Sequence, residues 1–326
     1  MNVDISTTYM GLKLNSPFIA ASSGFTAKVS NIVELEKAGA GAIVLKSLFE
    51  EQIDGESNFL DAINADHPEN SDYLQYYVRE GALSNYLKLV KEAKAAVKIP
   101  IIASINCYNS GSWASFAKDI ENAGADAIEI NIYSLPLNLN DTSKNIEEEY
   151  FNVISKIKAT VKIPVAVKIG ENFTSLPKFV DSLKGYGASA VVLFNKFYHP
   201  DIDVNRLQII GPDPFSKAGD CLRELRWIAI ISSVVRGVEI SASSGVLSGK
   251  DCIKLILSGA TTLQTCSALY KQGINAISEF TEELKAFMEW KGYSKLEDFR
   301  GLLNYSNVEN PQRYERVQFV KTFGQK

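Results

Sequence analysis

The chain of 326 residues is long enough to bury a full-sized core, and its content of 46% hydrophobic and 22% charged residues is that of a folded protein. The net charge of −4 disfavours nucleic acid as the main partner, because phosphate binding requires a basic face. No apolar run approaches the ~18 residues that span a bilayer, and the N-terminus lacks the basic and apolar segments of a signal peptide. The four cysteines have no paired spacing, so we expect a cytoplasmic protein with reduced thiols.

Eight apolar segments along the chain are typical of buried strands, beginning with "SPFIAASSG" at 16–24. Four of the others share the order helix end, glycine, small residue and apolar strand: "KAGAGAIVLKS" (37–47), "NAGADAIEIN" (122–131), "GYGASAVVLFN" (185–195) and "LSGATTLQTCS" (257–267). The glycine suits a left-handed helix end, and the continuous apolar run suits a strand that is covered on both faces. The remaining three follow helix-like segments: 97–106, 161–170 and 238–245.

Helical patterns lie between these strands, for example at 81–97, 112–124 and 146–161. Eight alternating β and α units predict an α/β fold of the (β/α)₈ TIM barrel class. A doubly wound sheet is the alternative, but no GxGxxG turn follows the first predicted strand. We expect a single domain over residues 1–326, with a barrel core at about 10–275 and a helical tail at 276–326.

Two long segments interrupt the repeat. Residues 48–80 form an acidic insertion after the second strand, and residues 196–226 form another after the sixth. Loops of this length inside a compact domain usually serve as lids or binding loops. We therefore expect both insertions to belong to the functional part of the molecule.

Polar and small residues follow the predicted strands, at the end of the barrel where such folds bind ligands. The set comprises two lysines, three asparagines and several small residues: Ala21, Ser22, Ser23, Gly24, Lys46, Ser47, Asn106, Asn131, Ser134, Lys168, Asn195, Ser243, Ser244, Gly245, Cys266 and Ser267. No cluster of histidines and carboxylates is among them, so we expect no metal site. The set predicts a pocket for a polar, planar ligand that forms many hydrogen bonds.

The last two strand ends add a phosphate-binding pattern. The segments "SASSGVLSGKD" (241–251) and "TLQTCSALYKQG" (262–273) each place a turn of small residues before a helix, where backbone amides can bind an anion. No basic residue beside this pair of turns could serve a pyrophosphate, which favours a mononucleotide over a dinucleotide. We interpret Cys266 as a packing residue, and the mid-strand Glu129 as the partner of a lysine inside the barrel.

These residues resemble those of the dihydroorotate dehydrogenases. The resemblance covers about residues 10–275 and rests on "NSPFIAASSG", "GAIVLKS", "EIN" with "SLP", "VAVKI" and, most specifically, residues 241–273. It is closest to the soluble class 1 enzymes, and "VVLFNKFYHPDID" and "LRWIAI" resemble a divergent bacterial subgroup called dihydroorotate dehydrogenase-like. The resemblance implies an FMN-dependent oxidoreductase of pyrimidine biosynthesis that converts dihydroorotate to orotate.

The resemblance also implies roles for individual residues. FMN would be bound by Ala21, Ser22, Lys46, Ser47, Asn106, Asn131, Lys168, Ser244, Gly245, Cys266 and Ser267, the last four at its phosphate. Lys168 would offset negative charge on the reduced flavin. Substrate would be bound by Lys46, Asn131 and Asn195, and the catalytic residues would be Lys46 and Ser134, with Ser134 as the general base.

Two segments depart from the family pattern. Class 1 enzymes read "NLSCPN" after strand four, with cysteine as the base, whereas this chain reads "NIYSLPLN". Ser134 is the nearest candidate and Tyr133 the second, and a serine needs an activating partner because its pKa is far above that of a thiol. The family's "NxxGxxN" substrate loop is absent from "GESNFLDAINADHPENSDYL" (55–74). FMN is therefore the firmer inference, and another cyclic amide is an alternative substrate.

Other functions remain open from the sequence. A Schiff-base lyase would use Lys46 or Lys168 as its nucleophile, and a homologue without catalytic activity would bind FMN only. A tRNA-modifying flavin barrel is disfavoured by the acidic net charge. For the dehydrogenase, the resemblance implies a homodimer and a soluble electron acceptor such as fumarate.

Overall fold

The structure is a computed structural model that describes residues 3–49, 71–107, 113–132, 135–196, 199–211 and 213–315, with the backbone alone at 71–80 and 107. Its barrel strands are β3 (Phe18–Ala20), β4 (Ala42–Val44), β5 (Leu48–Phe49), β6 (Ile101–Cys107), β7 (Ala127–Ile132), β8 (Val165–Ile169), β9 (Ala190–Leu193), β12 (Glu239–Ser243) and β13 (Thr262–Thr265). All pair in parallel in the order β4-β3-β13-β12-β9-β8-β7-β6-β5, and a β4–β6 pairing closes the sheet. β4 and β5 pair with successive parts of β6, so these two short strands together occupy one position in the barrel. The predicted (β/α)₈ barrel is therefore confirmed.

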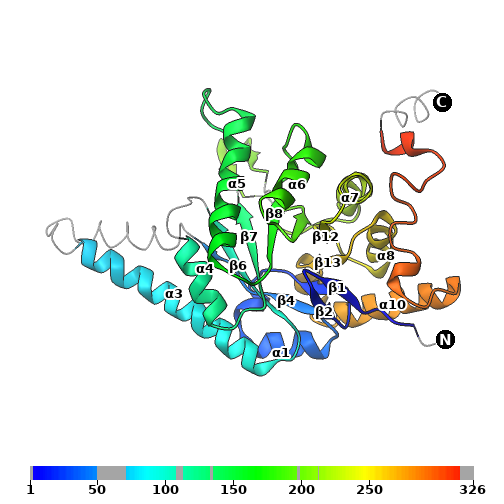
Figure 1. The fold of residues 1–326 in the computed structure, drawn as a ribbon, viewed down its shortest axis with the longest axis horizontal. Helices are drawn as coiled ribbons and strands as arrows, with labels where there is room; N and C mark the ends of the chain where they lie inside the picture. Colours follow the sequence, from blue (N-terminus) through cyan, green and yellow to red (C-terminus); the bar gives the residue numbers. More distant parts are fainter. Residues whose placement is uncertain are drawn as a thin grey trace.

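Helices surround the barrel (Figure 1). They are α1 (Val29–Lys37), α3 (Ser71–Ala96), α4 (Trp113–Asn122), α5 (Ser143–Thr160), α6 (Leu176–Gly185), α7 (Cys221–Val234), α8 (Gly249–Ser258), α9 (Ser267–Gln272) and α10 (Ala276–Lys291). Short 3₁₀ helices occur at Phe25–Ala27, Leu296–Asp298 and Pro311–Tyr314. Among the described residues, no helix is both long enough and apolar enough to cross a membrane.

The four repeated glycines end helices as predicted. Gly39, Gly124, Gly187 and Gly259 all have positive φ, from 98° to 118°. The residue after each glycine donates its backbone N–H to a helical carbonyl five positions earlier, as from Ala260 to Leu255 O at 3.0 Å. This is the bond pattern of a Schellman C-cap, and it turns the chain directly into the next strand.

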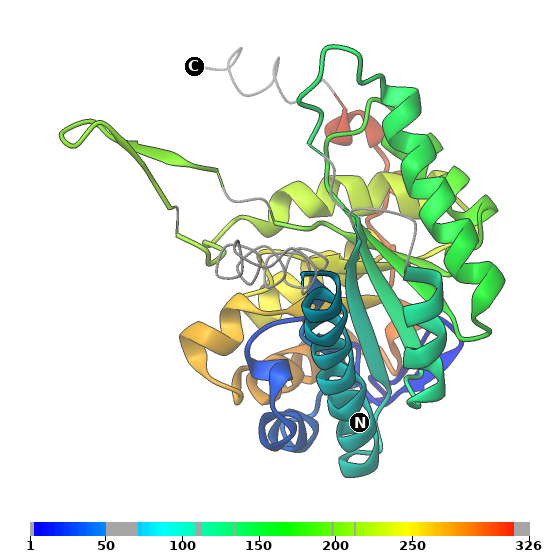
Figure 2. The same cartoon turned by 90° about the vertical axis from the view of Figure 1, so that its left-hand side faces the viewer.

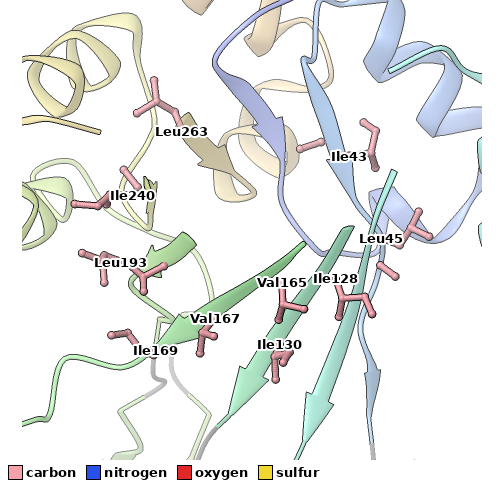
Figure 3. Close-up of a cluster of buried hydrophobic side chains, with 14 of the residues drawn as sticks. Ile43, Leu45, Ile128, Ile130, Val165, Val167, Ile169, Leu193, Ile240 and Leu263 are labelled. Carbon is pink, nitrogen blue, oxygen red and sulfur yellow. The ribbon is translucent and has the colours of Figure 1, made fainter. Parts of the chain in front are cut away.

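Apolar side chains of the strands divide between two cores. Outward-facing residues such as Ile128, Val165 and Leu193 pack with the surrounding helices in one large cluster (Figure 3). Inward-facing residues at the amino end pack against an N-terminal hairpin of β1 (Thr7–Tyr9) and β2 (Leu12–Leu14). Tyr9 and Leu14 of this hairpin are buried, so the hairpin closes that end of the barrel.

The segment after β9 carries an antiparallel hairpin of β10 (Asp201–Asp203) and β11 (Gln208–Ile210), which projects from the barrel as a yellow-green arm (Figure 2). Its apolar side chains Ile202, Val204, Leu207 and Ile209 are exposed. The helix that follows begins at Cys221, inside the range 196–226 that the sequence suggested for the insertion. Of the other predicted insertion, residues 50–70 lie outside the described part of the chain, and α3 begins at Ser71 rather than near 81.

The tail after α10 packs on the amino end of the barrel and on its outer helices. Asp4 N–H donates to Ser294 O at 2.8 Å, and the guanidinium of Arg300 donates to Thr7 Oγ1 at 2.8 Å. Leu303 N–H donates to Leu257 O at 2.9 Å, where α8 ends. Residues 294–303 are thus held at the amino end of the barrel and beside α8.

Candidate functional site

A polar cavity of about 340 Å³, here called the inner cavity, lies at the carboxyl ends of the strands. It is lined by Ser22, Ser47, Phe49, Ser104, Asn106, Glu129, Asn131, Lys168, Asn195 and Lys196. Asn195 Nδ2 donates to Asn131 Oδ1 at 3.2 Å, which joins the ends of β9 and β7. The three asparagines and Lys168 that the sequence singled out are therefore brought together around one cavity.

A buried carboxylate forms the floor of the inner cavity. Glu129 is 1% exposed, and Gln264 Nε2 of β13 donates to its Oε2 at 2.5 Å. Lys168 Nζ on the neighbouring β8 lies 4.0 Å from Glu129 Oε1. The expected pairing of Glu129 with a lysine inside the barrel is confirmed.

Three hydroxyl groups form a chain along one side of the inner cavity. Ser22 Oγ lies 3.0 Å from Ser47 Oγ, which lies 2.7 Å from Ser104 Oγ. Ser47 N–H also donates to Ser22 Oγ at 2.9 Å. The chain fixes the loop after β3 to the short gap between β4 and β5.

Lys46 lies outside this arrangement. Val44 faces into the barrel and Leu45 faces the helices, so a regular strand would direct Lys46 inward. The strand is interrupted there, between β4 and β5. The hydroxyl group of Tyr86 on α3 takes the backbone hydrogen bonds of Ser104 on β6 instead: it accepts from Ser104 N–H at 2.7 Å and donates to Ser104 O at 3.0 Å. Ser47 takes the inward position, and the exposed Lys46 lines none of the three cavities at this end of the barrel.

A smaller cavity of about 130 Å³, the side cavity, opens between β12, β13 and the segment before α7. It is lined by Ala21, Ser22, Lys168, Asn195, Lys196, Pro214, Ser216, Ser243, Ser244, Gly245, Val246, Gln264, Cys266 and Ser267. None of these lining residues is acidic and two are lysines, so the cavity suits an anion.

Ser216 connects the two predicted phosphate-binding turns. Gly245 N–H donates to Ser216 Oγ at 3.2 Å, and Ser216 N–H donates to Ser267 Oγ at 2.9 Å. Gly245 has φ +72°, and a Cβ there would lie 2.2 Å from Cys221 N, so only glycine fits. Ser244 has φ +80° and is held by donation of its hydroxyl to Phe194 O at 3.1 Å.

The thiol of Cys266 beside these turns is a poor nucleophile. Burial raises its pKa above the ordinary value, and the nearby ammonium of Lys168 offsets this only in part. A thiol that stays protonated at neutral pH fits a packing residue better than a nucleophile.

A third, outer cavity of about 500 Å³ adjoins the side cavity between the ends of β8 and β9 and the start of α7. Lys196, Arg223, Glu171, Asp220 and Glu224 are among its lining residues. Arg223 donates to Glu171 Oε1 at 2.9 Å, and Lys196 Nζ lies 3.6 Å from Asp220 Oδ2. Glu224 is 4% exposed, and burial raises its pKa to about 8.

Comparison with known proteins decides the family. The family model described as "Dihydroorotate dehydrogenase" matches residues 4–288. This chain belongs to the dihydroorotate dehydrogenase family.

Catalogued relatives of this dihydroorotate dehydrogenase family member carry consistent names. Proteins of Thermoplasma volcanium and Methanothermobacter thermautotrophicus are 29% and 25% identical to this chain, and both are named "Dihydroorotate dehydrogenase B (NAD(+)), catalytic subunit". The alignments cover 92% and 91% of this chain, respectively, and 98% of each relative.

Dihydroorotate dehydrogenases are flavin-dependent oxidoreductases, and the residues at the carboxyl end of this barrel fit a flavin nucleotide. The side cavity offers small residues, backbone amides and lysines without an acidic side chain, as a phosphate requires. The inner cavity next to it offers polar groups for the edge of a planar ring. Lys168 lines both cavities and could reach either part of such a ligand.

Four residues that line the inner and side cavities could not be assigned from sequence motifs alone: Ser104, Lys196, Ser216 and Gln264. Ser104 and Gln264 are polar residues inside apolar strands, which is a usable signal for an inward-facing position. Lys196 directly follows the predicted Asn195, whereas Ser216 lies in an insertion without any local signal. The two candidate bases, Tyr133 and Ser134, lie outside the described residues.

Proposed function

We propose that this chain binds FMN and oxidises dihydroorotate to orotate, a step of pyrimidine biosynthesis. The observation that supports this most strongly is the match of the dihydroorotate dehydrogenase family over residues 4–288, combined with an inner cavity that three asparagines line. Bound FMN would accept a hydride from the substrate. The protein would supply binding, orientation and a base for the accompanying proton.

For FMN, we propose two groups of binding residues. Ser244, Gly245, Cys266 and Ser267 would hold the phosphate in the side cavity, which all four line. Ala21, Ser22, Ser47, Asn106, Asn131 and Lys168 would contact the ring system, with Lys46 at its edge. Lys168 would favour the anionic reduced flavin, because a positive charge that is fixed in a largely buried position needs no reorganisation during the reaction.

For the substrate, we propose Asn131 and Asn195, whose side chains are hydrogen-bonded to each other across the inner cavity, together with Lys46. Ser134 would remove the proton as the general base, and Lys46 would assist catalysis. An amide pair of this kind can both donate and accept hydrogen bonds, which suits the ring amides of dihydroorotate or of a related cyclic amide.

We propose a soluble electron acceptor and a homodimer. The relatives are named for NAD⁺ as acceptor and as catalytic subunits, so fumarate and NAD⁺ are both worth testing. The exposed apolar side chains of the β10–β11 arm support burial against a second chain. The unpaired thiols of Cys221, Cys252 and Cys266 support a cytoplasmic location.

The visible spectrum of the purified protein before and after anaerobic dihydroorotate tests the proposal. A yellow protein that bleaches supports it. A yellow protein that does not bleach retains the flavin but refutes dihydroorotate as the substrate. A colourless protein that does not take up added FMN refutes the whole proposal, and trapping of a carbonyl compound on Lys46 or Lys168 by borohydride would then test a Schiff-base lyase.

A further inference from the structure

Lys196 occupies a central position at the mouth of the barrel. It directly follows Asn195 after β9, and it lines the inner, side and outer cavities. Its side chain is 29% exposed, so the ammonium is neither fully solvated nor sealed from a ligand. No motif assigns it a role.

The two lysines among the described lining residues of the inner cavity differ in how their charges are compensated. Of its lining residues, Lys168 and Lys196 carry positive charge and Glu129 carries negative charge. Glu129 is buried beside Lys168 and compensates that lysine. The partner of Lys196, Asp220, lines the outer cavity but not the inner one. Among the described lining residues, Lys196 is therefore the less completely compensated cation, because the side chains of its pair with Asp220 are 29% and 33% exposed and water screens their attraction. This favours an anionic ligand in the inner cavity.

The ammonium of Lys196 is held in place by the segment before α7. It donates to Phe215 O at 2.6 Å and lies 3.6 Å from Asp220 Oδ2. An ammonium has three N–H donors, and these two contacts account for two of them. Both partners line the outer cavity, and the third donor has no partner within the described part of the chain, so it is available to a ligand.

We infer that Lys196 is a specificity-determining residue that binds the carboxylate of the substrate and selects anionic cyclic amides over neutral ones. The inference rests on the proposed function. Lys168 is less suited to this task because its partner Glu129 is 2% exposed and compensates it more fully than the part-exposed Asp220 compensates Lys196. An anion that accepts a hydrogen bond from Lys196 would compensate its charge more fully.

The test uses the flavin-loaded protein and two planar probes of similar size, orotate and uracil, of which only orotate carries a carboxylate. Each is titrated while the absorbance change of the bound flavin is followed. Lys196→Met should weaken orotate binding about 10- to 100-fold, as for loss of a hydrogen bond to a charged group, and leave uracil binding unchanged. Lys196→Arg should retain most of the orotate affinity.

Lys217→Met is the matched control, because Lys217 lines the outer cavity but not the inner one. It should bind both probes as the wild-type protein does. Equal orotate affinity in Lys196→Met and wild type overturns the inference alone, as does an equal loss of both probes. Loss of FMN from Lys196→Met assigns the residue to the cofactor and also overturns it. A wild-type flavin that does not respond to orotate overturns the inference and the proposed function together.

Discussion

Lys168 and Glu129 form an ion pair inside the barrel, with 4.0 Å between Nζ and Oε1 on neighbouring strands. Gln264 from the opposite side donates to the other carboxylate oxygen at 2.5 Å. The side chain of Glu129 is 2% exposed and that of Lys168 is 12% exposed. A carboxylate in the middle of an apolar strand is thus explained by its ion pair with the lysine on the neighbouring strand, whose charge it compensates.

Replacement of Glu129 by glutamine should destabilise the protein. The new amide side chain would keep the shape of the carboxylate, but it would leave the ammonium of Lys168 without a counter-charge in a largely buried site. We expect the free energy of unfolding to fall by about 3 kcal/mol. Urea unfolding would measure this, with Glu148→Gln as control, since Glu148 forms an exposed pair with Lys144 and its loss should cost less than about 0.5 kcal/mol. Equal losses in the two variants would contradict the assigned role.

Much of the fold could be predicted because parallel strands that are covered on both faces leave a strong sequence signal. Every predicted strand segment overlaps a barrel strand, and the glycine before each repeated strand adopts the left-handed conformation. The pairing of Glu129 was predictable for a related reason, since a buried carboxylate requires a partner. Both signals are local in the chain and follow from burial alone.

Features that depend on contacts between distant segments could not be predicted. The exposure of Lys46 accompanies the interruption of the strand by Tyr86, a residue on α3 whose hydroxyl group takes the backbone hydrogen bonds of Ser104. The contact of Ser216 with Gly245 and Ser267 joins an insertion to two strand ends. Neither α3 nor the insertion carries a sequence pattern that identifies the distant residues it contacts.

Gly245→Ala should abolish flavin binding. The alanine Cβ would approach Cys221 N to 2.2 Å at a φ of +72°, so the backbone of the turn must shift. Gly219→Ala is the matched control, because Gly219 also has positive φ but has nothing within 4 Å of the added Cβ. The control should lose only about 1 kcal/mol of stability and keep its flavin absorbance. Normal flavin content in Gly245→Ala would exclude this turn from the phosphate site.

Lys168→Ala should lose flavin or slow its reduction. The substitution removes the cation that lines both the inner and the side cavities and leaves Glu129 buried without its partner. Flavin absorbance after gel filtration would measure occupancy, and anaerobic stopped-flow absorbance would measure the reduction rate. Full occupancy together with a wild-type rate would show that Lys168 does not act on the flavin.

Ser134→Ala should slow flavin reduction by dihydroorotate by roughly 10²-fold or more, which is the usual contribution of a general base. Flavin content should stay unchanged, because Ser134 is proposed to act on the substrate alone. Tyr133→Phe provides the comparison, since Tyr133 is the second candidate for the base. A slow Tyr133→Phe variant beside a normal Ser134→Ala variant would transfer the role to the tyrosine.

Glu224 predicts a pH dependence of stability. This carboxyl group lies in the first turn of α7, and its buried Oε2 has no hydrogen-bond partner among the described residues. Burial raises its pKa from 4.5 to about 8, an increase that Glu171 and Asp220 reinforce and Arg223 opposes. The folded protein therefore holds a proton that the unfolded chain releases above about pH 4.5.

This difference in proton binding means that Glu224 favours the folded state at low pH. The contribution of Glu224 is complete below pH 4.5 and is lost as the pH rises to about 8, with a slope of up to about 1.4 kcal/mol per pH unit. Glu224→Gln has no titrating carboxyl group at this position. The unfolding free energy of this variant should therefore decline less between about pH 5 and about pH 8 than that of the wild type. The exposed Glu149 supplies the control, because Glu149→Gln should retain the wild-type slope. Parallel pH profiles for all three proteins would mean that the carboxyl group of Glu224 is ionised in the folded state at neutral pH.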